Sequence, residues 1–406
     1  MFSISLPDVP TKVLAVKLTV QGERSVRSEH PWIFSDSIEK ISKEGASGDI
    51  AVIFSHTKNK PMGVGLYDPD SPIRIKMVHF GSGAQLNTSF FNESIQNAYT
   101  LREELLKTQT NSYRLLFGEN DGFPGLIADV YDNVLVVKLY SAIWFPFLEI
   151  VLGHLIEISD VDCCVIRLSR NLQNKNTYEI TDGAVVYGQL DNEIVPFVEH
   201  GVHFSANVIK GHKTGYFLDH RANRKRVGEL AHGKTVLDVF SYAGGFSVHA
   251  LVGGATEVTS LDISRQALEV AKENVKLNPI KGTHKTIVGD AFEEMKSLIG
   301  KGRQYDIVVI DPPSFAKSAK EVAVAKKKYA QLAHLGAKLV TAKGILVLAS
   351  CSSRVMAQDF FEINSRSLKH SGRKYKVMDQ TFHDTDHPIA FPEGAYLKCE
   401  YYRFSG

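Results

Sequence analysis

Two residues in the C-terminal half of the chain, Cys351 and Asp311, have side chains suited to covalent chemistry. Cys351 directly follows the apolar run 344–350 and is flanked by small hydroxyl residues. Asp311 ends the apolar run 306–311 and precedes two prolines. A thiolate is a strong nucleophile, and a carboxylate can accept hydrogen bonds from amines. We therefore predict a catalytic pair at the ends of two strands.

Methylation at carbon 5 of a pyrimidine requires such a nucleophile. That carbon becomes enamine-like only after a thiolate has added to carbon 6, and loss of the carbon-5 proton later expels the thiol. Asp311 would hydrogen-bond the base, which must first leave its stack. A lone cysteine can equally be an inert core residue, which is the role we expect for Cys163, Cys164 and Cys399. For Cys351 the residues alone leave both interpretations open.

A glycine-containing turn and two later acids predict a nucleoside site. The run 235–240 ends in Phe240 and is followed by the turn 241–245, whose glycines let a ligand approach the backbone. Asp262 ends the second strand-like run and suits ribose hydroxyls, and Asp290 follows the third and suits an adenine amine. The dinucleotide pattern G-x-G-x-x-G is missing, and no phosphate-binding G-K-[ST] follows the turn. Their absence favours S-adenosylmethionine, which has ribose and adenine but no phosphate.

The segment after Asp311 is suited to a flipped base. Pro312 and Pro313 fix the backbone there, and Phe315 could stack on the base. Two basic clusters flank this segment and suggest contacts to phosphates, although such clusters are usually solvated helix faces. Their members are Lys210, Lys213, Arg221, Arg224, Lys225, Arg226 and Lys234 in the first cluster, and Lys317, Lys320, Lys326, Lys327 and Lys328 in the second.

The elements that must position these residues follow from periodicity. From about Gly233, apolar runs at 235–240, 257–262, 306–311 and 344–350 alternate with helical segments at 246–252 and 265–278. This alternation predicts an α/β domain with a parallel, doubly wound sheet that binds ligands at the carboxyl ends of its strands.

The N-terminal half differs. Strand-like runs at 13–20, 50–54, 63–66 and 73–77 predict a small β-rich domain. A helix around 91–105, strands at 134–140 and 163–169, and a helix at 144–158 predict a central α+β domain. We therefore expect three domains, at 1–82, 83–187 and 188–406.

Composition is that of a globular protein. The 406 residues are 44% hydrophobic and 23% charged, with a net charge of +2, which excludes neither a nucleic acid nor a small molecule as the partner. We expect no membrane span, because the apolar runs are shorter than the roughly 20 residues that a bilayer requires. Four cysteines without metal-ligand spacing predict neither a metal site nor a disulfide framework. A cytoplasmic protein with free thiols is expected.

With these features, the chain resembles the bacterial 23S ribosomal RNA cytosine-5 methyltransferases that carry an N-terminal PUA domain. Residues 18–35 resemble the opening of that PUA domain, and 118–129 the start of the family's central domain. Residues 211–221 resemble the lead-in to its catalytic domain, and 387–398 its closing motif. F-S-Y-A-G-G-F-S (240–247), D-P-P-S-F (311–315) and S-C-S-S (350–353) resemble its cofactor, base-pocket and nucleophile motifs.

The resemblance implies a Rossmann-like class I methyltransferase domain behind a PUA-like RNA-binding domain. It also implies S-adenosylmethionine as the methyl donor, ribosomal RNA as the substrate, a homodimer, and Cys351 as the nucleophile. The Asp-Pro-Pro strand carries no second cysteine, so the base that removes the carbon-5 proton is unassigned. The expected cofactor-binding residues are Arg221, Phe240, Ser241, Tyr242, Gly244, Gly245, Asp262, Ile263, Asp290 and Ala291, and the expected substrate-binding residues are Pro312, Pro313, Phe315 and Lys317.

Two other functions remain open for these residues. Methylation of guanine N7 or an exocyclic amine in ribosomal RNA would need no thiol, because a nitrogen lone pair attacks directly. A non-catalytic RNA-binding assembly factor could also keep this fold. Base analysis of the product distinguishes the first, and failure to bind S-adenosylmethionine would support the second.

Overall fold

The computed structural model describes residues 2–56, 59–175 and 178–405. The chain forms two compact units. Unit 1 comprises Met1–Val198, Ser205–Leu218 and Thr385–Gly394, and unit 2 comprises Glu199–Phe204, Asp219–Asp384 and Ala395–Gly406. The chain therefore passes between the units more than once.

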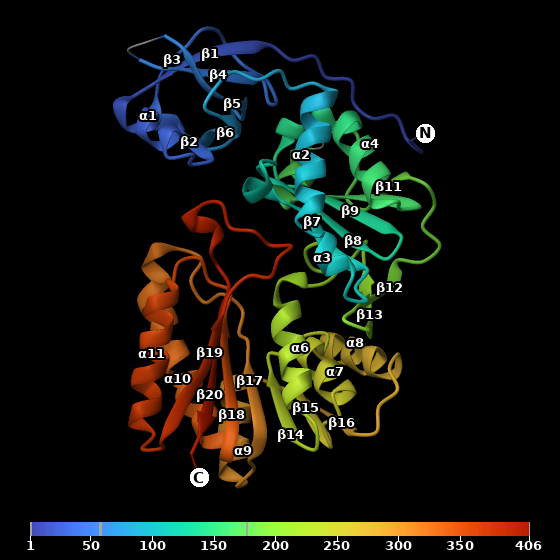
Figure 1. The fold of residues 1–406 in the computed structure, drawn as a ribbon, viewed down its shortest axis with the longest axis vertical. Helices are drawn as coiled ribbons and strands as arrows, with labels where there is room; N and C mark the ends of the chain where they lie inside the picture. Colours follow the sequence, from blue (N-terminus) through green and yellow to red (C-terminus); the bar gives the residue numbers. More distant parts are fainter. Residues whose placement is uncertain (1, 57–58, 176–177, 406) are drawn as a thin grey trace. The chain divides into compact units, whose positions relative to one another are not determined.

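The first part of unit 1 is a six-stranded sheet with the order β2-β6-β5-β4-β1-β3 (Figure 1). Its strands are β1 (Val13–Leu18), β2 (Trp32–Phe34), β3 (Ile38–Ile41), β4 (Ile50–Phe54), β5 (Pro61–Tyr67) and β6 (Ile73–Phe80), with a 3-10 turn η1 at Ser35–Ser37. The predicted strand 13–20 ends early, because Thr19 accepts a hydrogen bond from the Gly22 amide (3.2 Å) and caps helix α1 (Val20–Arg27). Sequence reasoning missed this helix, although the β-rich character of the region is confirmed.

The second part of unit 1 is a five-stranded sheet with the order β11-β10-β9-β8-β7. Its strands are β7 (Ser112–Phe117), β8 (Leu126–Tyr131), β9 (Val134–Leu139), β10 (Cys163–Leu168) and β11 (Ala184–Tyr187). The helices are α2 (Thr88–Thr100), α3 (Glu103–Leu106), α4 (Leu148–Ser159) and α5 (Arg170–Lys175), with 3-10 turns η2 (Gly118–Asp121) and η3 (Ala142–Phe147). The single helix predicted around 91–105 is therefore two helices, α2 and α3.

The helix predicted at 144–158 is a 3-10 turn followed by α4. Pro146 lies inside η3, where its missing N–H suits a short turn better than a long α-helix. By length and composition alone, Ala142–Ser159 could cross a membrane, a property that our sequence prediction overlooked. Half of this stretch is buried, and Leu148, Val151 and Leu152 belong to the core of unit 1. These contacts fit a core helix of this unit.

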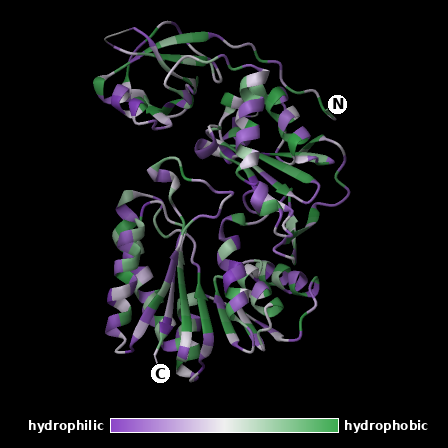
Figure 2. Ribbon diagram, in the orientation of Figure 1, coloured by the Kyte–Doolittle hydropathy of each residue, from purple (hydrophilic) through white to green (hydrophobic). Residues whose placement is uncertain are grey.

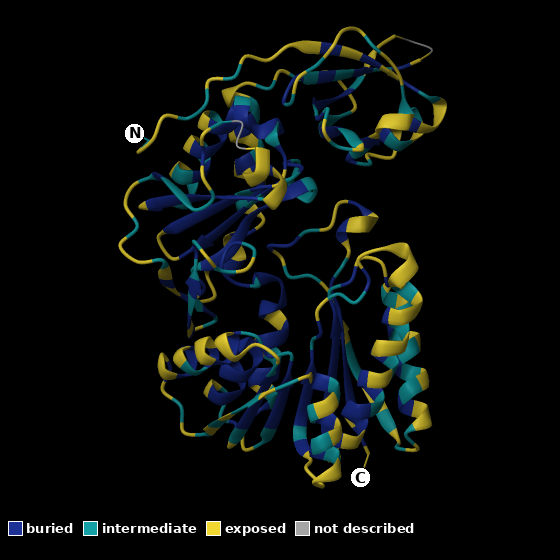
Figure 3. Ribbon diagram, turned by 180° about the vertical axis from the view of Figure 1, so that it is seen from behind, coloured by how far each residue is buried: buried dark blue, intermediate teal, exposed yellow. Residues whose placement is uncertain are grey.

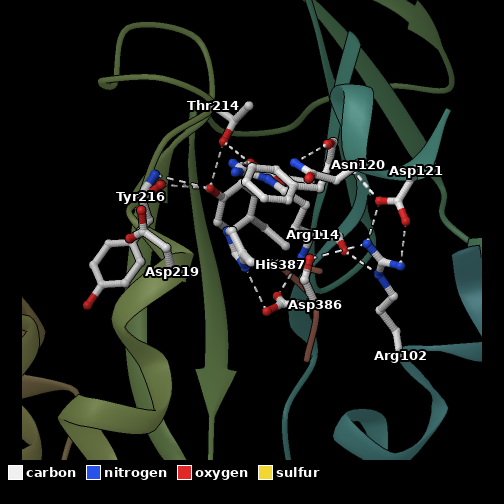
Figure 4. Close-up of polar contacts among 12 residues, drawn as sticks. Arg102, Arg114, Asn120, Asp121, Thr214, Tyr216, Asp219, Asp386 and His387 are labelled. Atoms are coloured by element: carbon white, nitrogen blue, oxygen red, sulfur yellow. Dashed lines mark hydrogen bonds and ion pairs between the residues drawn. The ribbon is translucent and has the colours of Figure 1, made fainter. Parts of the chain in front are cut away.

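Two segments distant in sequence complete unit 1 (Figure 4). In the lead-in segment, Thr214 donates to Asp129 (2.5 Å). In the closing segment, Asp386 accepts from the Arg114 amide (2.9 Å) through its side chain and from Arg102 (3.2 Å) through its carbonyl. In the closing motif itself, the His387 ring packs against Phe117 of β7, with 5.0 Å between ring centroids. The lead-in and closing motifs thus contact the five-stranded sheet.

Unit 2 contains a seven-stranded sheet with the order β16-β15-β14-β17-β18-β20-β19 (Figure 1). Its strands are β14 (Thr235–Val239), β15 (Glu257–Asp262), β16 (Thr283–Val288), β17 (Tyr305–Ile310), β18 (Val340–Ser350), β19 (Tyr375–Thr381) and β20 (Lys398–Phe404). Strands β14 to β18 pair in parallel, whereas β20 is antiparallel to both β18 and β19. This is the predicted doubly wound sheet, extended by two strands that periodicity did not reveal. A separate two-stranded pair, β12 (Ile194–Glu199) and β13 (Val202–Asn207), precedes it.

Helices cover the seven-stranded sheet in two groups. Helices α6 (Arg221–Leu230), α7 (Gly245–Val252) and α8 (Arg265–Lys276) contact one another in series, as do α9 (Ala291–Gly300), α10 (Val322–Leu339) and α11 (Ala357–His370). The remaining 3-10 turns are η4 (Leu218–His220), η5 (Ala319–Glu321) and η6 (Pro392–Gly394), of which η6 belongs to unit 1. The middle strands are apolar (Figure 2) and buried, while α8 and α11 expose one face (Figure 3). Because β14 to β18 run parallel, their carboxyl ends lie at one edge of the sheet.

Candidate active site

The turn after β14 is held in an unusual backbone conformation. Phe240 and Tyr242 have positive φ values of 64° and 47°, and Gly244 has a φ of 77°. A left-handed conformation costs roughly 1–3 kcal/mol at a residue other than glycine, so the surrounding structure must enforce it. The amides of Phe240 and Ser241 both donate to the Leu261 carbonyl (2.9 and 3.1 Å), which ties this turn to β15. Backbone strain of this kind is typical of a ligand-binding turn.

Glycine is required at position 244 for a second reason. A Cβ atom there would lie 2.8 Å from the Cβ atom of Ala271 in α8. The missing side chain therefore lets the turn and α8 pack closely, and α7 begins at the next residue, Gly245. The close approach seen here is to α8, so the binding of a ligand by Gly244 and Gly245 stays a prediction.

Asp262 organises the same edge from β15. Its carboxylate accepts from the amides of Tyr242 (2.9 Å) and Ser264 (2.8 Å). Each carboxylate oxygen has two lone pairs, so both can still accept hydrogen bonds from ribose hydroxyls. The neighbouring Ile263 is 73% exposed and presents an apolar surface at this edge.

Asp290 lies at the end of the next strand and caps α9. Its carboxylate accepts from the amides of Phe292 (3.0 Å) and Glu293 (3.2 Å), and Ala291 is buried as the first residue of the helix. Asp262 and Asp290 thus stand at neighbouring strand ends, since β15 pairs with β16.

Two buried polar atoms at the turn indicate a ligand. Among the residues that the structure describes, Asp238 Oδ1 and Ser241 Oγ have no hydrogen-bond partner. Burial raises the pKa of Asp238 to about 7, although hydrogen bonds from Ser247 oppose this rise. Buried polar groups are nearly always hydrogen-bonded, so a ligand that carries an ammonium group and other polar groups would satisfy these atoms. The amino-acid end of S-adenosylmethionine fits this requirement. Sequence reasoning did not include Asp238 in the site, although an acid inside a buried strand was a visible signal.

Arg221 does not contact phosphates, contrary to our interpretation of the first basic cluster. Its side chain is fully buried and forms an ion pair with Asp384 (3.2 Å). Arg224 is also buried and pairs with Glu199 (2.6 Å). Amphipathic spacing placed these two arginines on the inner face of α6, where the cations are neutralised by acids. A place for Arg221 beside the cofactor stays a prediction.

Exposed members of the basic clusters differ from these arginines. Lys210 pairs with Glu193, Lys225 with Glu229, and Lys326 with Asp359, all at partly or fully exposed positions. Such pairs contribute little stability and exchange readily for phosphate contacts. Lys317 is exposed as well, and its carbonyl accepts a hydrogen bond from Arg354 (3.2 Å).

Asp311 follows β17 and faces a buried histidine that sequence reasoning missed. His220 Nε2 lies 3.3 Å from Asp311 Oδ1. Burial acts to lower the pKa of His220, but the Asp311 carboxylate outweighs it and the pKa is raised overall. The pair can hold a proton next to a bound base. The only sequence signal was the adjacency of His220 to Arg221 in the lead-in motif.

The segment after Asp311 forms a wall with an aromatic side chain. Pro312 is buried and Pro313 is exposed. The half-buried Phe315 packs against Tyr329 of α10, with 5.3 Å between ring centroids, and the ammonium of Lys328 lies 4.8 Å from the Phe315 ring centroid. Stacking of Phe315 on a base stays a prediction, and the ring is in place to support it.

Cys351 differs from the other three cysteines, as predicted. Cys163, Cys164 and Cys399 are buried, and burial raises the pKa of each of these thiols. Cys351 is half-buried, and its Sγ lies 3.8 Å from the Pro312 carbonyl oxygen. The structure therefore brings the two predicted catalytic strand ends together, since β17 pairs with β18.

The loop that carries Cys351 is held by Ser350 and Lys398, which lie in motifs noted in the sequence but whose contacts were not predicted. Ser350 donates to the Tyr329 hydroxyl (2.9 Å), and Lys398 of β20 donates to the Ser352 carbonyl. Neither contact has a local sequence signal, because both partners lie far from Cys351 in the chain.

Comparisons with known proteins agree with this geometry. A family model described as S-adenosylmethionine-dependent methyltransferase matches residues 113–381, and a PUA-like domain model matches residues 16–80. The chain is 40% identical to a ribosomal RNA large subunit methyltransferase of Deinococcus radiodurans, over 98% of both chains. It is 33% identical to ribosomal RNA large subunit methyltransferase I of Escherichia coli, over 93% of this chain and 96% of the relative.

Solved structures share the fold. A protein from Streptococcus mutans described as a methyltransferase matches with a TM-score of 0.80 at 21% identity, over 96% of this chain and 99% of that chain. A methyltransferase structure solved in complex with S-adenosylhomocysteine matches with the same TM-score, identity and coverage. The PUA-like domain and the Rossmann-like sheet expected from the sequence are therefore both confirmed.

Proposed function

The chain belongs to the family of S-adenosylmethionine-dependent methyltransferases, and we propose that it methylates carbon 5 of a cytosine in large-subunit ribosomal RNA through the thiol of Cys351. S-adenosylmethionine is its methyl donor, as predicted. The proposed substrate rests on the names of the two relatives, which match nearly the whole chain. The proposed chemistry rests on the site itself.

One observation carries the assignment to carbon 5. Of the four thiols, Cys351 alone is not buried, and it lies at the strand end beside Pro312. Methylation of a nitrogen has no use for a thiol at this place, because the lone pair attacks directly. Carbon 5 of cytosine requires one, since only addition at carbon 6 makes it nucleophilic.

Separate sets of residues are proposed to bind the methyl donor and the target cytosine. Asp262, Asp290, Asp238 and Ser241 would bind the donor, whose sulfonium would supply an electrophilic methyl group. The flipped cytosine lies beside Phe315, and Asp311 accepts a hydrogen bond from its exocyclic amine.

The covalent step begins when the Cys351 thiolate adds to carbon 6. The electron pair of the carbon 5–carbon 6 double bond would then form the new bond to the methyl carbon, while the methyl–sulfur bond breaks and its electron pair stays on the sulfur as a neutral thioether. Loss of the carbon-5 proton restores the double bond and expels the thiolate, so that the cysteine is regenerated. This sequence of steps needs no oxidant or reductant.

The remaining parts have supporting roles. We assign residues 1–82 to a PUA-like RNA-binding domain, 83–187 to the central domain and 188–406 to the catalytic domain, of which 188–198, 205–218 and 385–394 pack within unit 1. The exposed residues Lys317, Lys320 and Lys327 would contact RNA phosphates. The family resemblance further implies a homodimer in the cytoplasm, and sedimentation of the purified protein would test the dimer.

The proposal is tested by transfer of labelled methyl groups to large-subunit ribosomal RNA that lacks the modification, followed by digestion to nucleosides. The wild type should form 5-methylcytosine, and Cys351→Ala should form none while it still binds S-adenosylhomocysteine. Cys163→Ala, which removes a buried thiol, is the matched control and should stay active. A methylated guanine or adenine, or an active Cys351→Ala variant, would instead support methylation at nitrogen.

A further inference from the structure

Lys398 is a buried lysine beside the nucleophile loop that the mechanism above does not use. It begins β20 and pairs with Ser350 in the antiparallel ladder with β18. Paired residues in such a ladder project to the same face of the sheet, so its side chain runs alongside Ser350 toward the loop. The residue is only 1% exposed.

The ammonium group of Lys398 is fixed under this loop. Its Nζ atom donates to the carbonyl of Ser352, and also to the carbonyl of Tyr396 (3.0 Å). Ser352 directly follows Cys351, so this ammonium restrains the backbone that carries the sulfur. Two neutral carbonyls orient the ammonium but supply no compensating negative charge.

A buried ammonium is costly unless an anion lies nearby. In the part of the chain that the structure describes, Lys398 forms no ion pair with a carboxylate. Burial lowers the pKa of Lys398 to about 8, and the charge of the Cys351 thiolate acts in the opposite direction. The anion that this lysine has available is therefore the thiolate of Cys351.

We propose that Lys398 is a positioning residue for the nucleophile, which holds Cys351 as a thiolate and fixes the loop that carries it. This role deepens the proposed function and rests on it, since a thiolate is needed only if Cys351 attacks carbon 6. The lysine itself is too deeply buried to reach a bound base. It is therefore not the group that removes the carbon-5 proton.

Some of the other ionisable groups near Cys351 favour its thiolate form and some disfavour it. The Asp311 carboxylate at the end of β17 disfavours a thiolate, but His220 faces it at 3.3 Å and offsets its charge. Tyr329 on α10 stays neutral, because burial raises its pKa to about 12. Arg354, in the loop after Cys351, is exposed and donates to the Lys317 carbonyl. Lys398 is thus the buried cation on the β20 side of the loop.

The test measures the thiol directly, without RNA or cofactor. The rate of alkylation of the full-length protein by iodoacetamide is followed from pH 5.5 to 10, and peptide mapping confirms Cys351 as the modified residue. Because the other three thiols are buried, alkylation should be selective for Cys351. An ordinary cysteine has a midpoint of about 8.5, and a neighbouring cation lowers it by about one pH unit or more.

The wild type should therefore titrate clearly below pH 8.5. Lys398→Met, which keeps the length of the side chain but removes its charge, should be alkylated about tenfold more slowly at pH 7. Lys398→Arg should recover most of the wild-type rate at that pH. A wild-type midpoint at or above about 8.5 would overturn the proposal, and that result needs no variant to fold. Equal midpoints for wild type and Lys398→Met would overturn it as well.

This readout separates the two proposals. A lowered thiol midpoint together with a methylated guanine product would refute the carbon-5 assignment and leave the thiolate pairing intact. An ordinary midpoint together with Cys351-dependent 5-methylcytosine would refute the role of Lys398 and leave the assignment intact.

Discussion

Replacing Glu199 with glutamine should strongly destabilise unit 2. The Glu199 carboxylate is fully buried and accepts from Arg224 Nε (2.6 Å) and Nη2 (2.7 Å), and it also lies 2.8 Å from His249 Nε2. These contacts tie the end of β12 to α6 and α7, which cover the sheet beside the cofactor turn. In Glu199→Gln the buried guanidinium would lose its charged acceptor and would face an amide that can donate.

The magnitude follows from burial. Removal of one partner from a buried ion pair costs about 3–5 kcal/mol, because the other charge stays out of water. With a denaturant slope of about 2 kcal/mol/M, a loss of about 4 kcal/mol lowers the midpoint of urea unfolding by roughly 2 M. By contrast, Glu269→Gln removes an exposed partner of Lys272 on α8 and should cost under about 1 kcal/mol.

The pH dependence gives an independent check. Burial acts to raise the pKa of Glu199, but Arg224 and His249 outweigh it and hold the pKa well below its usual value of 4.5. A carboxyl group with a depressed pKa stabilises the folded state above its unfolded value and loses that effect as the pH falls. The stability gap between the wild type and Glu199→Gln should therefore narrow below pH 4.5. Urea unfolding of Glu199→Gln within about 1 kcal/mol of the wild type at pH 7 would refute this reasoning.

Three further predictions concern the site. Gly244→Ala forces a Cβ atom to within 2.8 Å of Ala271 and should weaken S-adenosylhomocysteine binding at least tenfold in calorimetry. Gly300→Ala is the control, because a Cβ atom there meets nothing within 4 Å, and it should bind as tightly as the wild type. Equal affinities for the two variants would contradict this prediction. Because burial raises the pKa of Asp238 to about 7, its carboxyl group gains negative charge as the pH rises from 6 to 8. The affinity of the wild type for the ammonium-bearing cofactor should therefore rise over that range, whereas the affinity of Asp238→Asn should not change. Parallel pH profiles for the two proteins would show that another group titrates. Phe315→Leu should raise the KM for RNA several-fold and leave S-adenosylhomocysteine affinity unchanged; a matching loss of cofactor affinity would make Phe315 a core residue only.

The amino-acid sequence predicted the part of the fold that rests on local patterns. Continuous apolar runs identified β14, β15, β17 and β18, since strands buried on both faces need apolar residues throughout. The carboxyl ends of these strands lie at one edge of a parallel sheet. For this reason the turn at 241–245, Asp262, Asp311 and Cys351 could be assigned to one site from residue types and spacing alone.

Contacts between distant segments could not be predicted in this way. Strand β20 inserts between β18 and β19 in antiparallel orientation and so brings Lys398 beside the loop of Cys351, but no local pattern specifies where a late strand pairs. Likewise, His220 gains its importance only from the approach of Asp311.

Charge in the sequence was misleading where burial decided the outcome. The sequence predicted that Arg221 and Arg224 belong to a basic surface, but each side chain is buried and pairs with an acid far away in the chain. The capped helix α1 was missed because it is a short, mostly polar helix between strands.

The central claim is that Cys351 forms a covalent bond to carbon 6 of the target cytosine. RNA that contains 5-fluorocytosine tests it most directly. Fluorine replaces the carbon-5 hydrogen, so no proton can be removed from carbon 5, and the adduct should accumulate after methyl transfer. The wild type with S-adenosylmethionine should give a protein–RNA complex that survives denaturation, with the nucleotide attached at Cys351 by mass spectrometry, and Cys351→Ala should give none. A wild-type enzyme that methylates unmodified RNA but forms no such adduct on the fluorinated RNA would contradict the account.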